Sequence, residues 1–199
     1  MTFALDLTEE QAAIKHAVEE ICAKYDDHYW LNVDNSGEFP NAFVNDIAEG
    51  GWLGVAMPES VGGAGLGLTE AALMMQTVAA SGAGFSGASA IHLNIFGLMP
   101  IVKFGTPEQQ QRFLPPAIDG TDKACFAVTE PNSGLDTSSL ETRAERTNSG
   151  YRINGRKIWT TNAQRANKIL IIARTTPKHQ VKRPTEGLSL FYADFDRKH

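Results

Sequence analysis

The pattern of apolar residues changes near Asp119-Gly120, and this change restricts the folds available to the chain. Before it, apolar residues recur at the three- and four-residue spacing of amphipathic helices. After it, short alternating or apolar runs rich in β-branched residues are separated by turn residues. We therefore expect an α+β protein with two domains. Residues 1–120 would form an all-α helical N-terminal domain, and residues 121–199 a β-barrel-like antiparallel sheet domain that is incomplete at its C-terminal end.

Helix boundaries can be read in several places. Thr8 with Gln11 and Thr106 with Gln109 have the spacing of a capping box, in which each side chain bonds the other's backbone N–H. Residues 26–37 are polar and read as a loop. Residues 82–87 match G-x-G-x-x-G but follow a helix instead of a strand, so we expect a helix stop and a turn there and no dinucleotide site. Residues 88–104 read as a buried helix interrupted at Pro100, because proline lacks an N–H group.

Composition excludes several classes of protein. The 199 residues carry a net charge of −5 without a long basic run, so nucleic acid is not an expected partner. No uninterrupted apolar run approaches the roughly 18 residues of a membrane span, so we expect none. Cys22 and Cys125 are far apart and have no metal-type spacing. They read as reduced core thiols of a cytoplasmic protein, and no metal site is expected.

A Gly- and Ser-rich loop follows the first apolar run of the second domain. Residues 124–128 read as a buried strand, Pro131 ends its ladder, and Asn132-Ser133-Gly134 forms a turn. Such a loop offers free backbone N–H groups beside a rigid strand end, which suits a flat polar ligand or a phosphate. The alternative interpretation is a connection between two strands with no ligand.

A second stretch supplies an aromatic ring and hydroxyl groups. Asn154-Gly155 is a strong two-residue hairpin signal, and residues 157–162 after it read as a strand. Trp159 and Thr161 are two positions apart, so strand alternation would put both side chains on one face. Trp159 taken alone would be read as a core tryptophan.

Together the two stretches resemble the acyl-CoA dehydrogenase family. The family's loop signature matches at Ala127, Val128, Thr129, Glu130, Ser133, Gly134, Asp136 and Ser139, and its hairpin and Trp-x-Thr-Asn strand match residues 153–162. Leu135 is the one departure, because the family has a hydroxyl residue at that position. Weaker matches run through the whole chain.

The resemblance implies FAD as cofactor and an acyl-CoA thioester as substrate. The matching cofactor residues are Phe126, Val128, Thr129, Gly134, Leu135, Trp159, Thr160 and Thr161. On the substrate side the resemblance points to Leu135, to Ser133 as the neighbouring hydroxyl, and to His92 and Phe96 on the helix that lines the acyl cavity in the family. His92 can equally be a core histidine with satisfied hydrogen bonds.

The implied reaction is α,β-desaturation, in which a carboxylate removes the α proton and the β hydride passes to flavin N5. The family's glutamate base lies in a C-terminal helical domain that these 199 residues lack, so no catalytic residue is assigned and Glu130 is expected to tether the loop. As an N-terminal fragment the chain would be inactive or nearly so. The resemblance also implies an electron-transfer flavoprotein as acceptor and a homo-oligomer, dimeric or tetrameric, for the complete protein.

Two other functions remain open from the sequence. One is a flavin-dependent oxidase or monooxygenase on a related scaffold. The other is a non-catalytic module that binds acyl-CoA or a partner protein. The length and branching of the acyl chain are not predicted.

Overall fold

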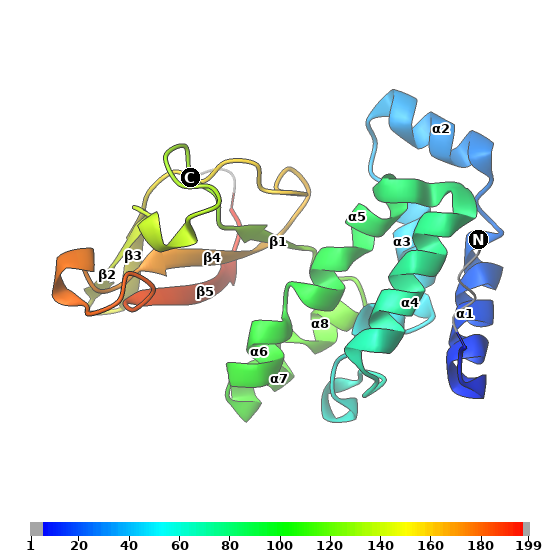
Figure 1. The fold of residues 1–199 in the computed structure, drawn as a ribbon, viewed down its shortest axis with the longest axis horizontal. Helices are drawn as coiled ribbons and strands as arrows, with labels where there is room; N and C mark the ends of the chain where they lie inside the picture. Colours follow the sequence, from blue (N-terminus) through cyan, green and yellow to red (C-terminus); the bar gives the residue numbers. More distant parts are fainter. Residues whose placement is uncertain (1–5, 197–199) are drawn as a thin grey trace. The chain divides into compact units, whose positions relative to one another are not determined.

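A computed structural model describes residues 6–196 of the chain (Figure 1). The chain divides into two compact units, Met1–Asp122 and Lys123–His199. The first is helical and the second contains a sheet that does not close into a barrel. The predicted order, a helical part followed by a β part, is therefore confirmed.

Within residues 6–122, the first unit contains eight α-helices: α1 (Glu9–Cys22), α2 (Asp27–Ser36), α3 (Asn41–Glu49), α4 (Leu68–Val78), α5 (Gly84–Phe96), α6 (Met99–Phe104), α7 (Pro107–Phe113) and α8 (Pro115–Ile118). Both capping boxes are present, at Thr8 and at Thr106. One face of each longer helix is buried in a common core, which includes Val18, Phe43, Ile47, Met74, Val78, Ile91 and Ile95.

The loop predicted for residues 26–37 is wrong, because α2 occupies this segment. The Asp26 side chain caps it by accepting a hydrogen bond from the Tyr29 N–H at 2.9 Å, and Gly37 ends it in the left-handed conformation with φ 66°. Trp30 is the one fully buried residue of α2, and its ring packs edge-on against Phe43 with 5.1 Å between centroids. A helix that buries a single side chain has almost no apolar periodicity to read.

The glycine-rich stretch 82–87 contains the predicted break between two helices, because Gly82 has non-helical backbone angles of φ 101° and ψ −20°. The π-helical segment Ala79–Ala83 follows α4, and the chain kinks at Gly82 before α5 begins at Gly84, which has φ 53°. By length and composition alone Leu68–Phe104 could cross a membrane, a possibility that the count of uninterrupted apolar residues missed. Because α4 and α5 supply four of the buried core residues named above, we interpret this run as core.

The second unit contains β1 (Ala124–Ala127), β2 (Arg143–Thr147), β3 (Gly150–Asn154), β4 (Lys168–Arg174) and β5 (Leu188–Asp194). The pairs β2–β3 and β4–β5 are antiparallel, as predicted. β1 and β2 both pair with β4 in parallel, so the sheet is mixed and the wholly antiparallel arrangement is corrected. Parallel neighbours need a long connection, and the loop and hairpin between β1 and β4 provide it.

The strand predicted for residues 157–162 is not formed. β3 ends at Asn154, and the hairpin turn lies at Asn148-Ser149, where Thr147 pairs with Gly150. Residues 155–160 are irregular, and Trp159 (φ 56°) and Asn162 (φ 61°) adopt left-handed backbone conformations. A left-handed residue interrupts the alternation of a strand, so the expected shared face of Trp159 and Thr161 does not follow from strand geometry.

Candidate functional site

Hydrogen bonds join the two motif stretches within the second unit. The Ile158 N–H donates to the Thr129 carbonyl at 2.9 Å, directly beside Trp159. Lys157 Nζ donates to the Val128 carbonyl at 2.8 Å and to Glu130 Oε1 at 2.9 Å. These bonds hold the loop after β1 against the irregular segment after β3.

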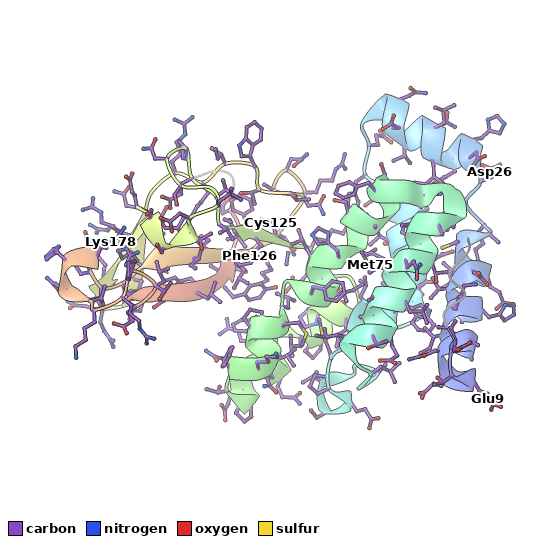
Figure 2. All side chains as sticks on the ribbon, in the orientation of Figure 1. Glu9, Asp26, Met75, Cys125, Phe126 and Lys178 are labelled. Atoms are coloured by element: carbon purple, nitrogen blue, oxygen red, sulfur yellow. The ribbon has the colours of Figure 1, made fainter. Side chains whose placement is uncertain are left out.

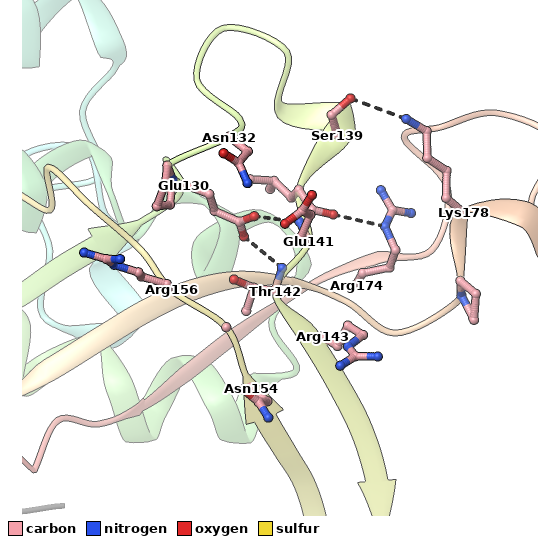
Figure 3. Close-up of a pocket in the computed structure, with 14 residues that line it drawn as sticks. Glu130, Asn132, Ser139, Glu141, Thr142, Arg143, Asn154, Arg156, Arg174 and Lys178 are labelled. Carbon is pink, nitrogen blue, oxygen red and sulfur yellow. Dashed lines mark hydrogen bonds between the residues drawn. The ribbon is translucent and has the colours of Figure 1, made fainter.

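Glu130 is the buried anchor of this arrangement (Figure 3). Only 5% of the residue is exposed, and its carboxylate accepts hydrogen bonds from the backbone N–H groups of Glu141 at 2.6 Å and Thr142 at 2.9 Å. Burial raises the pKa of this carboxyl, but the bonds from Thr142, Glu141 and Lys157 outweigh it and lower the pKa to about 2. A carboxylate that stays ionised and fully engaged is a tether and cannot serve as a general base near neutral pH.

Short polar side chains shape the rest of the loop. Glu130 and Ser133 form an isolated β-bridge, and the Ser133 hydroxyl donates to the Asp136 carbonyl at 2.6 Å. The Asp136 carboxylate accepts from the hydroxyl groups of Ser138 and Ser139, and the bond from Ser138 is the main reason that its pKa is lowered. The loop conformation is therefore fixed by bonds within the loop itself.

Arg174, the last residue of β4, joins the same loop to the segment before β5. Its guanidinium donates to the carbonyl groups of Ser138 at 2.8 Å, Pro184 at 3.1 Å, Glu186 at 3.2 Å and Leu140 at 3.4 Å. Arg174 is only 7% exposed. A buried guanidinium with four carbonyl partners restricts both segments at once.

Two large apolar residues that the sequence motif singles out are open to solvent. Leu135 is fully exposed and Trp159 is 86% exposed, although both are large apolar residues. A Cβ placed on Gly134 would have no other heavy atom within 4 Å. Within residues 6–196, the backbone N–H groups of Gly134 and Leu135 donate to no backbone acceptor. An exposed ring can hold one face of a flat aromatic ligand, and free N–H groups can bind an anionic group.

The other predicted cofactor residues are in the same unit. Phe126 lies on β1 next to the buried Cys125 (Figure 2), and it is half-buried, as are Val128, Thr129 and Thr160. Thr161 is exposed in the turn that follows Thr160. The eight predicted cofactor residues therefore all belong to the two segments that the Ile158–Thr129 bond joins.

The predicted substrate residues do not share one environment. Ser133 is buried with its hydroxyl bonded inside the loop, so it does not present a free hydroxyl in place of Leu135. His92 and Phe96 lie on α5 in the first unit. His92 Nδ1 is 3.0 Å from the Ser89 carbonyl oxygen, and Phe96 packs against the helical core. The role of these two residues in substrate binding stays a prediction.

Sequence reasoning missed Lys157 and Arg174 as parts of the site. Both act through carbonyl groups and a carboxylate that are 10 to 36 positions away in the chain. The only sequence signal for Arg174 was a basic residue at the end of an apolar strand, and Lys157 lies in the irregular segment after β3. Among residues 6–196, no group of three His, Cys, Asp or Glu side chains is placed to hold a metal ion.

A cavity of about 960 Å³ lies beside the loop (Figure 3). Its walls come from the base of the loop at Glu130–Asn132, from residues 139–143, from the end of β3 at residues 154–156, and from Arg174, Pro177 and Lys178.

Family models match nearly the whole chain. The model described as "Acyl-CoA dehydrogenase, N-terminal domain" matches residues 8–121, and the one described as "Acyl-CoA dehydrogenase, middle domain" matches residues 125–199. The chain belongs to the acyl-CoA dehydrogenase family. The resemblance drawn from the loop and the tryptophan segment is thus confirmed.

Individual relatives agree with this assignment. The chain is 36% identical over 172 residues to the probable acyl-CoA dehydrogenase YngJ of Bacillus subtilis, covering 85% of this chain and 44% of YngJ. It is 35% identical to the benzylmalonyl-CoA dehydrogenase of Aromatoleum aromaticum, covering 85% and 45%. The structure of an acyl-CoA dehydrogenase from Geobacillus kaustophilus superposes with a TM-score of 0.84 at 27% identity, covering 97% and 50%. The chain thus spans about half the length of these relatives.

Proposed function

We propose that this acyl-CoA dehydrogenase homologue provides the flavin-binding half of an FAD-dependent enzyme that desaturates acyl-CoA thioesters between Cα and Cβ. The observation that carries the proposal is the Ile158–Thr129 hydrogen bond of 2.9 Å, which joins the two family motifs beside the exposed ring of Trp159. When bound, the flavin would supply the acceptor for the hydride and its electron pair.

The residues present fit this cofactor. Trp159 is 86% exposed, so its ring is available as a platform for one face of a flat heterocycle. Thr161 brings an exposed hydroxyl two positions later, which can donate to a polar edge where negative charge develops. The free N–H groups of Gly134 and Leu135 can bind a phosphate oxygen. The left-handed backbone of Trp159 is a strained conformation of the kind that functional sites retain.

No residue of this chain is assigned to proton abstraction. Glu130 is excluded because it is ionised, buried and bonded to Lys157 and two backbone N–H groups. We infer that a carboxylate outside these 199 residues removes the α proton, and that the chain by itself does not turn over a thioester. We further propose that the complete protein is cytoplasmic and homo-oligomeric.

An electron-transfer flavoprotein is the proposed electron acceptor. A chain that superposes with a TM-score of 0.83 at 30% identity comes from a structure described as "Electron transferring flavoprotein of Acidaminococcus fermentans: Towards a mechanism of flavin-based electron bifurcation". This description supports an acceptor of that class for the family fold, and the proposal extends it to the complete form of this protein.

The test is a titration of FAD with the purified chain, followed by flavin fluorescence and by the absorbance spectrum. We expect the flavin fluorescence to be quenched and the flavin absorbance spectrum to shift, because a flavin ring packed on Trp159 is removed from water. Trp159→Ala should weaken binding at least about tenfold, on the scale of one lost aromatic contact. The control is Phe85→Ala, which removes a ring that is 87% exposed in the helical unit.

Absence of any flavin signal at millimolar FAD, with a folded chain, would refute flavin binding by this unit. Equal losses in the Trp159 and Phe85 variants would refute the assigned platform. Adding an acyl-CoA to the FAD-loaded chain should leave the oxidised flavin spectrum unchanged. Bleaching by the thioester would show that the chain contains its own base and would overturn that part of the proposal.

A further inference from the structure

The cavity beside the loop carries more positive than negative side chains (Figure 3). Four cationic residues line it, Arg143, Arg156, Arg174 and Lys178, against the two carboxylates of Glu130 and Glu141. Its lining includes none of Gly134, Leu135, Trp159 or Thr161, so it is a different surface from the flavin platform proposed above.

The two carboxylates do not neutralise the cavity. Glu130 is already compensated by Lys157 Nζ at 2.9 Å and by two backbone N–H groups. Glu141 is exposed, and its carboxylate forms no ion pair within residues 6–196. An exposed carboxylate is strongly hydrated and offsets little of a neighbouring buried charge.

None of the four cations forms an ion pair with a carboxylate in the described part of the chain. Arg174 is buried and bonds only carbonyl oxygens, so its charge is a fixed feature of the wall. The guanidinium groups of Arg143 and Arg156 make no hydrogen bond or ion pair to residues 6–196. Lys178 Nζ has one weak hydrogen-bond partner there, the Ser139 hydroxyl at 3.3 Å, and its charge contributes to the lowered pKa of Asp136.

We propose that this cavity binds the phosphate group of a small molecule. Arg143 and Lys178 supply the direct contacts, and Arg174 supplies a buried positive charge behind them. Guanidinium and ammonium donors form their strongest hydrogen bonds with phosphate and carboxylate oxygens. A volume of about 960 Å³ exceeds the need of one phosphate and is within the range that holds a nucleotide-sized ligand. This proposal does not depend on the proposed flavin chemistry.

Isothermal titration of the full chain with inorganic pyrophosphate and with ADP tests the site. We expect one binding event for each probe, weakened by added salt because the contacts are ionic. The double variant Arg143→Gln with Lys178→Gln should weaken binding at least about tenfold, on the scale of one lost charged hydrogen bond. The matched control, Arg152→Gln with Lys182→Gln, removes two exposed cations that do not line the cavity.

The two probes separate the sources of the phosphate. Equal affinity for pyrophosphate and ADP would identify a site for free phosphate groups. Tighter binding of ADP would identify a nucleotide site. Both outcomes support the proposal. If the control variant weakens binding as much as the Arg143 and Lys178 double variant does, the effect comes from net charge alone, and the proposal is overturned. Loss of pyrophosphate binding after saturation with FAD would show that the anion belongs to the flavin surface, which would also overturn a separate site.

Discussion

Replacing Glu130 by Gln should destabilise the second unit in a pH-dependent way. The substitution keeps the shape of the side chain but removes the charge that faces Lys157 Nζ and the N–H groups of Glu141 and Thr142. A carboxyl whose pKa falls from 4.5 to about 2 on folding contributes roughly 3 kcal/mol to stability near pH 7. Removal of one partner from a buried ion pair costs about 3–5 kcal/mol, which agrees with the value obtained from the pKa shift.

The sign of the pH dependence follows from the lowered pKa. The unfolded chain binds the proton more tightly than the folded chain, so the contribution of Glu130 is fully present above about pH 4.5. It is lost progressively as the pH falls toward 2. The difference in unfolding free energy between the unaltered chain and the Gln variant should therefore shrink from about 3 kcal/mol at pH 7 toward zero at pH 2.

Urea denaturation monitored by circular dichroism at pH 7, 5, 4 and 3 measures this difference. Hydrogen exchange of peptides from residues 124–147 would assign the loss to the sheet unit. Glu141→Gln is the matched control, because this carboxylate lines the same cavity but is exposed, and it should change stability by less than about 0.5 kcal/mol. A constant difference between the Glu130→Gln variant and the unaltered chain across this pH range would refute the argument that the charge of Glu130 holds the loop.

Three further substitutions test the backbone and the caps. Gly155→Ala should lower the unfolding free energy measured by urea denaturation by about 1–3 kcal/mol, because the added Cβ would lie 2.2 Å from Thr142 Oγ1. The control is Gly134→Ala, where the added Cβ would have open space around it. Gly82→Ala should lower the melting temperature by several degrees, since φ is 101° and the Cβ would lie 2.9 Å from Asp27 Oδ1. Thr106→Ala should cost about 1 kcal/mol in the same denaturation assay through loss of its capping bond, whereas Thr69→Ala, inside α4, should cost less.

The elements with strong local signals could be predicted from the sequence. Thr8 and Thr106 cap their helices as the spacing required, because a cap involves residues only three positions apart. The apolar run over residues 169–173 lies in the central strand β4, which pairs with β1 on one edge and with β5 on the other. A segment cannot be predicted in this way when tertiary contacts outweigh its local sequence pattern. The helix α2 is an example, because the contact of Trp30 with Phe43 packs an otherwise polar segment.

The tryptophan segment shows where local reasoning ends. Its residues have high strand propensity, yet Lys157 and Ile158 are bonded to the loop after β1 instead of a neighbouring strand. The bonded residues are 27 to 29 positions apart in the sequence. The left-handed conformation of Trp159 could not be predicted either, because the usual signal for it is a glycine at that position. The family motif singled out Trp159, whereas the geometry that presents its side chain outward required the structure.

The loop contacts also explain how the second unit of this chain can present an ordered surface to the proposed cofactor. Glu130, Asp136 and Arg174 find all of their described partners inside the second unit, and the bonds of Glu130 and Arg174 are buried. Buried, fully bonded polar groups restrict a loop without help from a ligand. Trp159 and the free N–H groups of Gly134 and Leu135 are therefore held in place before any cofactor arrives. Because a preorganised loop loses little conformational entropy on binding, flavin affinity in this chain should depend on the Glu130 anchor as well as on the Trp159 ring.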